Sequence, residues 1–393
     1  MHSQSETGLK PMSDIDKLLD ALEELATQEQ EAVMATVVKV EGSAYRRPGA
    51  RMLISQIGSA VGTVSGGCLE SDLAKKAWWL TEQRKPVVRT YSTGIPGDEA
   101  GEEEELAFGL GCNGTVHILL ERVLVGQPFL PAQLLRQVIR LQRPAALATV
   151  ISGTGEAAAL TGARAALSPL GTLLQSGNHA VLVDLLMDDL QAAFEYQKTA
   201  LHRYKVGSEE IEVLLEYLAP PRKLVIFGAG HDAQPLVAMA KQQGWQVTVI
   251  DARSHFITRE RFPNADQVMH LSLEHEQVPS ELITNAAVII MSHSYLQDRH
   301  WLAQSLSQSP SYVGQLGPRS RTERMLAEIP NSHSQPAFEQ LHYPMGLDIG
   351  GDTPEVIALS LLAEITAHFN GRNGGMLKAR ETSIHDAVPV MQH

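Results

Sequence analysis

Hydrophobic residues in the first part of the chain follow a helical pattern and then a strand-like one. Leucine and isoleucine recur at helical spacing over residues 14–28, which predicts an amphipathic helix capped by Ser13. Residues 32–40 are rich in β-branched side chains and predict a strand, and residues 51–55 predict a second strand after a loop. Three further elements are predicted in this region, a helix and two strands, at residues 69–81, 86–91 and 115–121.

The strand pattern returns later in the chain at one constant offset and without a gap. Residues 145–171 repeat residues 32–58, and Gly49-Ala50-Arg51 recurs as Gly162-Ala163-Arg164. Such a repeat predicts two related halves, in which the shared positions are scaffold. The alternative is chance similarity between two alanine-rich strands.

The second copy differs from the first in two places. It has Ala158-Ala159-Leu160-Thr161 where the first copy has Tyr45-Arg46-Arg47-Pro48. It also runs almost directly into an apolar stretch at residues 180–185, which we predict to be the strand that corresponds to residues 115–121. On this alignment the second copy lacks the whole segment that holds both cysteines. The Tyr-Arg-Arg-Pro run and the cysteine segment are therefore predicted to be the specialised parts of the first copy.

The carboxyl half alternates apolar strands with helices. Residues 223–227 predict a buried parallel strand, followed by a tight glycine turn and a helix over residues 234–243. Further strands are predicted at residues 246–250, 286–291 and 312–315, and this alternation is typical of an open parallel sheet. Asp352-Thr353-Pro354-Glu355 then starts a long helix through about residue 369, with a capping side chain and a proline in its first turn.

Together these patterns predict an α/β protein with two domains. The first is a mixed α/β domain over residues 13–218, with a motif-bearing part at 13–125 and a degenerate repeat at 144–185. The second is a Rossmann-like domain with a parallel sheet over residues 222–370. A loose tail is predicted after it, over residues 371–393.

Composition narrows the class of protein. The chain has 393 residues, of which 44% are hydrophobic and 20% charged, as in ordinary globular proteins. A formal net charge of −13 disfavours nucleic acid as the main partner. No apolar run is long enough to span a bilayer, and the polar start does not match a signal peptide, so we expect a cytoplasmic protein without membrane contact. Two cysteines cannot build a disulfide framework and are expected to be free thiols or ligands.

The glycine turn of the carboxyl half predicts a dinucleotide site. It follows a strand and opens a helix, and an acidic residue ends the next strand at about the required distance. The residues expected to bind the dinucleotide are Gly228, Gly230, His231, Ala233, Asp251 and Arg253. Asp251 would bind the ribose diol and favours NAD over NADP, whereas Arg253 could meet a 2′-phosphate. The alternative is a doubly wound domain that keeps the turn without binding a nucleotide.

Both cysteines lie in glycine-rich backbone. Cys68 follows Gly66-Gly67 at the predicted start of a helix, where the helix dipole would favour its thiolate, and Cys112 follows Gly111. Thiolates suit soft metal centres, and Arg46, Arg47 and Arg51 nearby in the sequence could hold a phosphate. The alternative for each cysteine is a small buried hydrophobic residue. A zinc site is disfavoured because no CxxC or paired His/Cys spacing accompanies the cysteines.

Two other stretches of the carboxyl half are candidates for the ligand crevice. His293 and Asp298 follow a strand whose carboxyl end should face this crevice, and they could touch a nucleotide or a substrate. Residues 346–351 are glycine-rich and could line the crevice or only permit a tight turn before the last helix. For His293, a hydrogen bond to the backbone of its own loop is the alternative.

One set of motifs in the amino-terminal half consists of Ala35-Thr36-Val37 and residues 42–52, 62–70 and 108–114. A second set in the carboxyl half consists of residues 227–231, 251–253, 261–266, 312–317 and 346–355. In combination, the first set resembles the amino-terminal domain of the XdhC/CoxI family of molybdenum-hydroxylase accessory proteins, and the second resembles the Rossmann domain of that family.

This resemblance implies a maturation factor rather than a turnover enzyme. It would bind the molybdenum cofactor, protect it while a sulfur ligand is installed, and pass it to an apo molybdenum hydroxylase such as xanthine dehydrogenase. The implied partners are this hydroxylase and a cysteine desulfurase-type sulfur donor. Cys68 and Cys112 would handle molybdenum or sulfur, and Arg46 and Arg47 would hold the phosphate. The cofactor-binding residues carried over from the motifs are Arg46, Arg47, Gly67, Cys68, Gly111 and Cys112.

Two other functions are kept as alternatives. An NAD(P)-dependent oxidoreductase would explain the carboxyl half but would leave the cysteines without a role. A thiol redox sensor would use Cys68 and Cys112 as a reversible disulfide. The apolar strands of the repeated region are also compatible with a homodimer.

Overall fold

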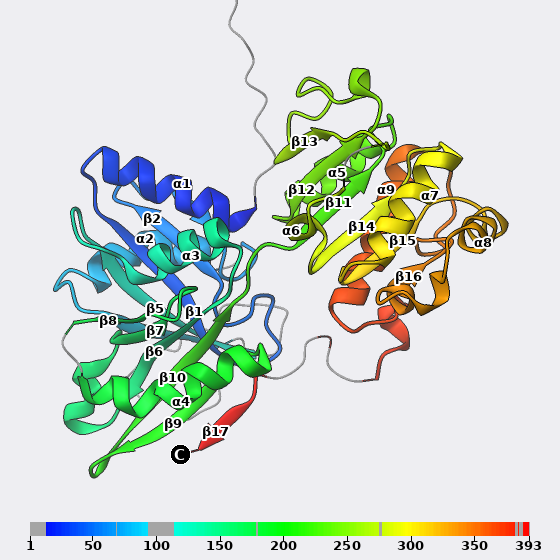
Figure 1. Cartoon of the computed structure of the whole chain (residues 1–393). Coiled ribbons are helices and arrows are strands. Elements are labelled where there is room, and N and C mark those ends of the chain that lie inside the picture. Colours follow the sequence, from blue (N-terminus) through cyan, green and yellow to red (C-terminus); the bar gives the residue numbers. More distant parts are fainter. Residues whose placement is uncertain are drawn as a thin grey trace, which may run out of the picture. The chain divides into compact units, whose positions relative to one another are not determined.

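The chain forms two compact units in the computed structural model (Figure 1). The structure describes residues 13–67, 69–92, 114–177, 180–274, 277–381, 384 and 388–392. The N-terminal unit contains residues 14–220 and the strand near the C-terminus, and the C-terminal unit contains residues 221–381. Within the described ranges, no helix combines the length and the apolar character needed to cross a membrane.

The first half of the N-terminal unit is a five-stranded antiparallel sheet with a helix on each face. Its elements are α1 (Asp14–Thr27), β1 (Ala32–Gly42), β2 (Arg51–Ser55), β3 (Ala60–Gly62), α2 (Glu70–Leu80), β4 (Val87–Ser92) and β5 (Gly114–Val123). The strand order is β3-β2-β1-β5-β4. Because side chains alternate along a strand, Met34 packs with α1 while Val33 and Ala35 pack with α2. The helices and strands predicted up to residue 121 are confirmed, and β3 is an additional strand.

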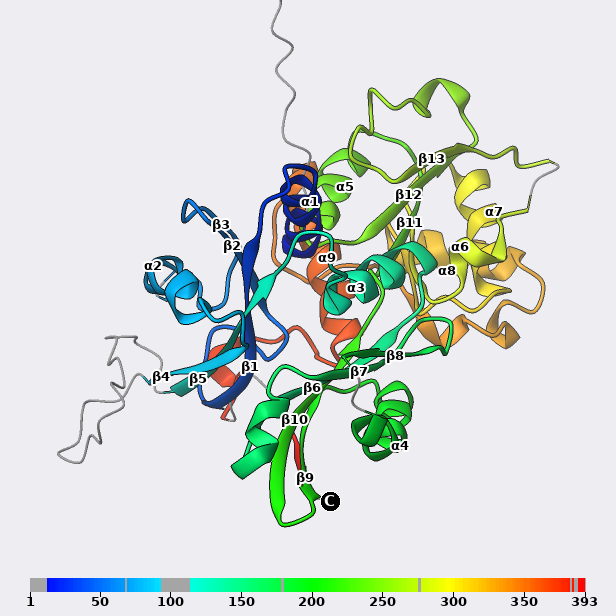
Figure 2. The same ribbon diagram turned by 90° about the vertical axis from the view of Figure 1, so that its left-hand side faces the viewer.

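The second half of the unit repeats this arrangement (Figure 2). Its elements are α3 (Leu130–Leu141), β6 (Ala145–Gly153), η1 (Gly155–Leu160), β7 (Arg164–Leu167), β8 (Leu173–Ser176), α4 (Ala180–Tyr196), β9 (Ala200–Val206) and β10 (Glu209–Leu218). Its strand order β8-β7-β6-β10-β9 corresponds strand by strand to the order β3-β2-β1-β5-β4 of the first sheet, so the internal repeat is structural. β17 (Val390–Gln392) adds to β9 in parallel, although we expected a loose tail there.

The predicted strand at residues 180–185 is wrong, because this stretch begins helix α4. A short apolar run alone does not distinguish a strand from a buried helix. Leu182, Leu186 and Leu190 are all buried, and their four-residue spacing places them on one helix face. The strand that corresponds to β5 is β10. The second copy thus has its own helix and strands and extends to Leu218. It lacks the long segment between β4 and β5, which a tight turn between β9 and β10 replaces.

One arginine of each repeat binds a glutamate of the other repeat. Arg51 on β2 donates through Nη2 to both carboxylate oxygens of Glu216 on β10, each at 2.8 Å. Its counterpart Arg164 on β7 binds Glu121 on β5 through two nitrogens, with Nη1 donating to Oε2 and Nη2 to Oε1, and both of these side chains are 7% exposed. A Cβ on Gly49 would lie 2.8 Å from Glu216 Oε1, so glycine leaves room for the carboxylate. Arg51 is therefore scaffold, as the repeat predicts, and its guanidinium is not free to hold a phosphate.

The C-terminal unit is built on a parallel sheet of order β13-β12-β11-β14-β15-β16. Its strands are β11 (Lys223–Phe227), β12 (Gln246–Asp251), β13 (Gln267–His270), β14 (Ala286–Ile290), β15 (Tyr312–Gln315) and β16 (Leu341–His342). Its helices include α5 (Ala233–Gln242), α6 (Ser280–Ile283), α7 (Tyr295–Leu306), α8 (Arg319–Glu328) and α9 (Pro354–Phe369). Apolar clusters cover both sheet faces, which confirms the predicted Rossmann-like fold.

Candidate functional site

The loop at residues 45–48, here called the basic loop, contacts the turn that precedes Cys68. Gly66 has a φ of +82°, and a Cβ on it would lie 2.7 Å from the ring carbon Cδ1 of Tyr45. Glycine at this position therefore lets the ring approach the backbone. Cys68 itself lies outside the described residues, two positions after Gly66. The fold thus brings the basic loop beside the segment that carries the first cysteine.

The described chain resumes after the second cysteine at the same end of the first sheet. Gly114 pairs with Gly42 at the end of β1, and a Cβ on Gly114 would lie 2.1 Å from the carbonyl oxygen of Ser43. The candidates Gly111 and Cys112 lie outside the described residues, within three positions of Gly114. Both cysteine-bearing segments therefore join the described structure next to residues 42–48.

The two arginines of the basic loop differ in their surroundings. Arg46 donates through Nη2 to Asp14 of α1 at 3.3 Å, and both side chains are partly exposed. Arg47 is exposed, and its guanidinium has no hydrogen-bond or ion-pair partner among the residues that the structure describes. Arg47 can therefore bind an anion directly, whereas Arg46 would first have to break its hydrogen bond to Asp14.

Glu70, the first residue of α2, binds the loop before it, which we call the Gly66 loop (residues 63–69). Its Oε1 accepts hydrogen bonds from Thr63 Oγ1 at 2.5 Å and from the amides of Val64 and Ser65 at 3.0 and 2.9 Å. Its Oε2 accepts from Ser65 Oγ at 2.5 Å and from the amides of Gly67 and Leu69 at 2.9 and 3.1 Å. The amides at the helix start, expected to favour a Cys68 thiolate, are therefore engaged by this carboxylate.

These contacts determine how Glu70 titrates. Burial alone would raise the pKa of Glu70, but hydrogen bonds from Ser65 and Thr63 outweigh it and lower the pKa to about 2. A carboxyl whose folded-state pKa is depressed stabilises the protein above its unfolded pKa, and this contribution is lost as the pH falls through the folded pKa.

We expect the difference in free energy of unfolding between the parent and a Glu70→Gln variant to depend on pH. It should be largest above about pH 5 and should shrink as the pH falls from 4.5 towards 2, because the parent carboxyl then becomes protonated in both states. Urea unfolding of both proteins across this range measures the difference. A difference that stays constant down to about pH 3 would contradict the assignment.

In the C-terminal unit, the glycine turn lies at the point where strand order reverses, between β11 and β14. Asp251 ends β12 as predicted but is fully buried. It accepts the amide of Ala229 at 2.8 Å, and Arg253 donates to it through its backbone amide, Nε and Nη2 at 2.7–2.9 Å. Burial raises the pKa of Asp251, but these donors outweigh it and the pKa is lowered.

A second carboxylate lies over the glycine turn. Asp232 Oδ1 is 2.4 Å from the position that a Cβ on Gly230 would take, and Asp232 Oδ2 lies 2.7 Å from His293 Nε2. His293 is exposed and has a φ of +61°. The chain's own carboxylates thus lie where a diphosphate and a ribose would bind, and the residues present do not fit NAD or NADP without breaking these contacts. The assignment of a dinucleotide to Gly228 and its neighbours stays a prediction.

The structure separates the two candidates that follow β14. His293 contacts Asp232 beside the glycine turn, but Asp298 is buried. Asp298 accepts the amide and hydroxyl of Ser292 at 3.0 and 2.5 Å and is paired with Arg321 Nη1 at 2.7 Å. Asp298 therefore holds the loop after β14 and is not exposed to a ligand.

Two patterns from known families match the chain: XdhC and CoxI family over residues 25–92, and XdhC Rossmann domain over residues 224–365. A relative from Bacillus subtilis, named as a probable xanthine dehydrogenase subunit, is 31% identical over 90% of this chain and 97% of its own length. The chain belongs to the XdhC and CoxI family. The resemblance carried by the sequence motifs is thereby confirmed.

Two further proteins are similar to this XdhC/CoxI family member. The molybdenum cofactor insertion chaperone PaoD of Escherichia coli is 23% identical over 86% of this chain and 83% of its own. A crystal structure described as a xanthine dehydrogenase from Bacillus halodurans is 26% identical, with a TM-score of 0.70 over 94% of this chain and 98% of that one.

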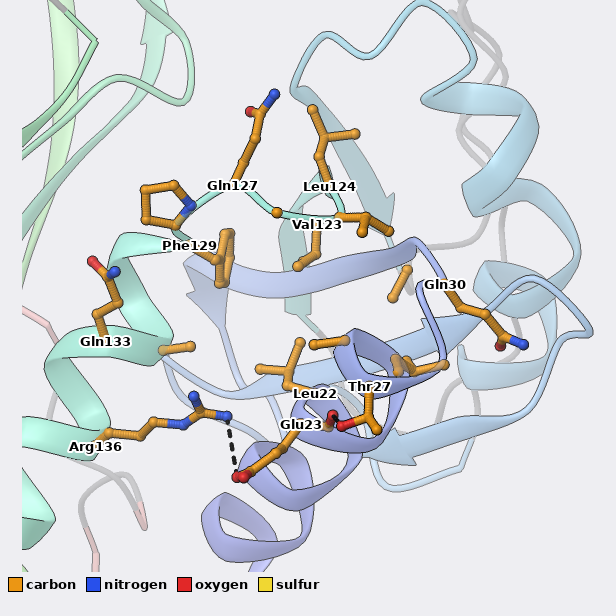
Figure 3. A pocket seen from close by; sticks show the side chains of 17 residues that line it. Leu22, Glu23, Thr27, Gln30, Val123, Leu124, Gln127, Phe129, Gln133 and Arg136 are labelled. Atoms are coloured by element: carbon orange, nitrogen blue, oxygen red, sulfur yellow. Dashed lines mark hydrogen bonds and ion pairs between the residues drawn. The ribbon is translucent and has the colours of Figure 1, made fainter.

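Two cavities are found in this XdhC/CoxI family member, and neither is lined by the basic loop or by the glycine turn. One of about 640 Å³ lies between α1 and α3, with an apolar wall that includes Leu22 and Phe129 and an ion pair of 3.7 Å between Glu23 and Arg136 (Figure 3). The other, of about 230 Å³, is lined by residues 347–351, which we considered as part of the crevice, together with α9. Among the described residues, no group of three acidic, histidine or cysteine side chains could hold a metal ion.

Sequence reasoning missed the roles of Glu70 and Asp232. Glu70 stands next to the motif that drew attention to Cys68, and a run of hydroxyl and glycine residues before an acidic helix start is the signal that could have found its role. Asp232 follows the glycine turn directly, where an acid is unfavourable for binding a diphosphate.

Proposed function

We propose that this protein binds the molybdenum cofactor as cargo and serves as a maturation factor for a molybdenum hydroxylase. The observation that carries the proposal is that the described residues adjoining the two cysteines in sequence, Gly66 and Gly114, both contact residues 42–45 at one end of the first repeat. The long segment before β5 and the two arginines are absent from the second repeat, which keeps only the shared scaffold. The name of the relative PaoD, a molybdenum cofactor insertion chaperone, supports the same function.

The chemistry of these residues suits such a cargo. The cofactor carries a terminal phosphate, which Arg47 would bind by charge-assisted hydrogen bonds, joined by Arg46 on release from Asp14. Its molybdenum centre is soft enough for the thiols of Cys68 and Cys112. A client hydroxylase of the xanthine dehydrogenase type would receive the cofactor, and a cysteine desulfurase-type donor would supply sulfur while the cofactor is held. We do not propose hydride transfer, because Asp232 and Asp251 fill the expected NAD(P) crevice with contacts of their own.

The proposal predicts separate effects for the cation and the thiols. Arg47→Ala should weaken binding of the molybdenum cofactor by about 10-fold or more, the value of a lost charge-assisted hydrogen bond. Cys68→Ala and Cys112→Ala should reduce delivery of active cofactor to an apo-hydroxylase. Cofactor retained after gel filtration, assayed by molybdenum content and pterin fluorescence, measures the first effect, and reconstituted hydroxylase activity measures the second.

Arg140→Ala is the matched control, because Arg140 is an exposed arginine on α3, outside the site. It should retain and deliver cofactor like the parent. The proposal fails if the purified parent protein carries no cofactor, or if both cysteine variants deliver it at the parental rate.

A further inference from the structure

The larger of the two cavities lies at the junction between the repeats. It is bounded by α1 and the end of β5 from the first repeat, by the connection at residues 124–129, and by α3, which begins the second repeat. Its volume of about 640 Å³ falls within the range of roughly 300–1,000 Å³ that is usual for sites that bind small molecules. All residues that line it belong to the N-terminal unit.

The wall of this cavity is apolar. Leu22 of α1, Val123 of β5 and Phe129 before α3 line the same space (Figure 3). Leu25 of α1 and Ala132 of α3 extend this wall. Leu25, Val123 and Phe129 are only partly buried, although they pack against the core that α1 and α3 share. Their remaining apolar surface is therefore available to the apolar part of a ligand.

One cation and one anion also line the cavity. Arg136 of α3 is the only basic residue of the lining, and Glu23 of α1 is the only acidic one. Their ion pair of 3.7 Å is longer than a hydrogen bond, and the side chains of Arg136 and Glu23 are 49% and 74% exposed (Figure 3). Such an exposed pair is weak, because water screens it. Arg136 Nη2 also donates to the carbonyl oxygen of Leu19 at 3.3 Å, which orients the guanidinium without neutralising its charge.

We propose that this cavity binds a small amphipathic carboxylate, with an aliphatic chain against the apolar wall and the carboxylate on Arg136 in place of Glu23. The wall is mostly aliphatic, so burial of an alkyl chain supplies the apolar part of the affinity. The guanidinium already lies beside a carboxylate, and it can bind a better placed one through two charge-assisted hydrogen bonds. A ligand with several negative charges is disfavoured, because a single cation lines the cavity and Glu23 lies beside it.

This site is separate from the proposed cargo site. The cavity lies along α1 from Leu22 onwards, whereas the basic loop contacts α1 at Asp14 through Arg46. The two sites share no lining residue, so the carboxylate is a second ligand of the N-terminal unit.

The test uses the full-length protein without cofactor and two probes with the same alkyl chain length, decanoate and 1-decanol. The parent should bind decanoate at one saturable site with a Kd on the order of 100 µM, measured by isothermal titration calorimetry near neutral pH. It should bind 1-decanol about 10-fold more weakly, because the alcohol cannot form the charge-assisted hydrogen bonds.

Three substitutions of exposed lining residues separate the charge from the apolar wall. Arg136→Gln should weaken decanoate binding about 10-fold and leave 1-decanol binding unchanged. Glu23→Gln should tighten decanoate binding by about 2–3-fold, because it removes the carboxylate that competes for Arg136. Gln133→Trp should weaken the binding of both probes, since the larger side chain occupies part of the cavity. Arg140→Gln is the matched control on α3, outside the lining, and should bind both probes like the parent.

The inference is overturned if the parent shows no saturable decanoate binding, or if it binds 1-decanol as tightly as decanoate. Decanoate binding that is the same in Arg136→Gln and in Arg140→Gln, or that Gln133→Trp leaves as in the parent, would place the ligand elsewhere and also overturn it. Circular dichroism confirms that each variant is folded before its titration. None of these measurements uses the molybdenum cofactor, so a parent protein that carries no cofactor contradicts the proposed function but not this site.

Discussion

Replacing Glu121 by alanine is expected to lower the free energy of unfolding of the N-terminal unit by about 3–5 kcal/mol, the cost of leaving a buried charge without its partner. The charge left behind is Arg164, whose guanidinium is almost completely buried between the two repeats and donates to Glu121 in a bidentate pair. Burial lowers the pKa of Arg164, but Glu121 outweighs it and the pKa is raised, so the guanidinium remains charged. Urea unfolding monitored by circular dichroism measures the loss.

Two controls separate the buried pair from ordinary surface charge. Arg84→Ala removes an ion pair with Glu31 in which the arginine side chain is 62% exposed, and it should cost less than about 1 kcal/mol. Combining Glu121→Leu with Arg164→Met should recover most of the loss, because an apolar pair of similar volume avoids the cost of desolvating two charges. A single Glu121→Ala variant as stable as the parent would show that the repeats do not depend on this contact.

Replacing Asp251 by alanine is the second substitution with a large expected effect, about 3 kcal/mol or more. The carboxylate is fully buried at the end of β12, and its removal leaves the Ala229 amide without an acceptor. Arg253 also loses its partner, but its side chain is 34% exposed and can turn to water, which limits the loss. Thermal unfolding followed by calorimetry measures the effect on the C-terminal unit.

The matched control for Asp251 is Asp352→Ala, since Asp352 is an exposed carboxylate in the same unit. It should change stability by less than about 0.5 kcal/mol. A titration of the parent protein with NADH tests whether Asp251 keeps its contact with Arg253 when a dinucleotide is offered. No saturable binding is expected while Asp251 and Arg253 bind each other, and tight NADH binding by the parent would contradict the view that this contact is kept.

Much of the fold is readable from local patterns. The β-branched residues of β1 and the helical spacing in α1 predicted elements that differ from the structure by one or two residues at their ends. The repeat of residues 32–58 at 145–171 predicted that Gly49 and Arg51 are scaffold. The strand–glycine turn–helix sequence around Gly228 predicted a Rossmann-like unit. These features are visible because periodicity and turn geometry depend on residues that are close in sequence.

The stretch at residues 180–185 shows where local pattern fails. A short apolar run is compatible with a strand or with one face of a helix, and only packing against the second sheet decides between them. The error shortened the second repeat, because β10 was not recognised as the counterpart of β5.

By itself the sequence determined the two-unit α/β plan, the internal repeat and the motifs that place the chain in the XdhC and CoxI family. Only the tertiary structure decided what the charged residues do. Arg51 meets Glu216 across 165 positions and Asp251 meets Ala229 across 22, so no short window contains both partners. The contact of Tyr45 with Gly66 likewise depends on how two loops pack. The physical reason is that burial and pairing of charge arise from contacts between distant segments, whereas helix and strand preferences arise from neighbours.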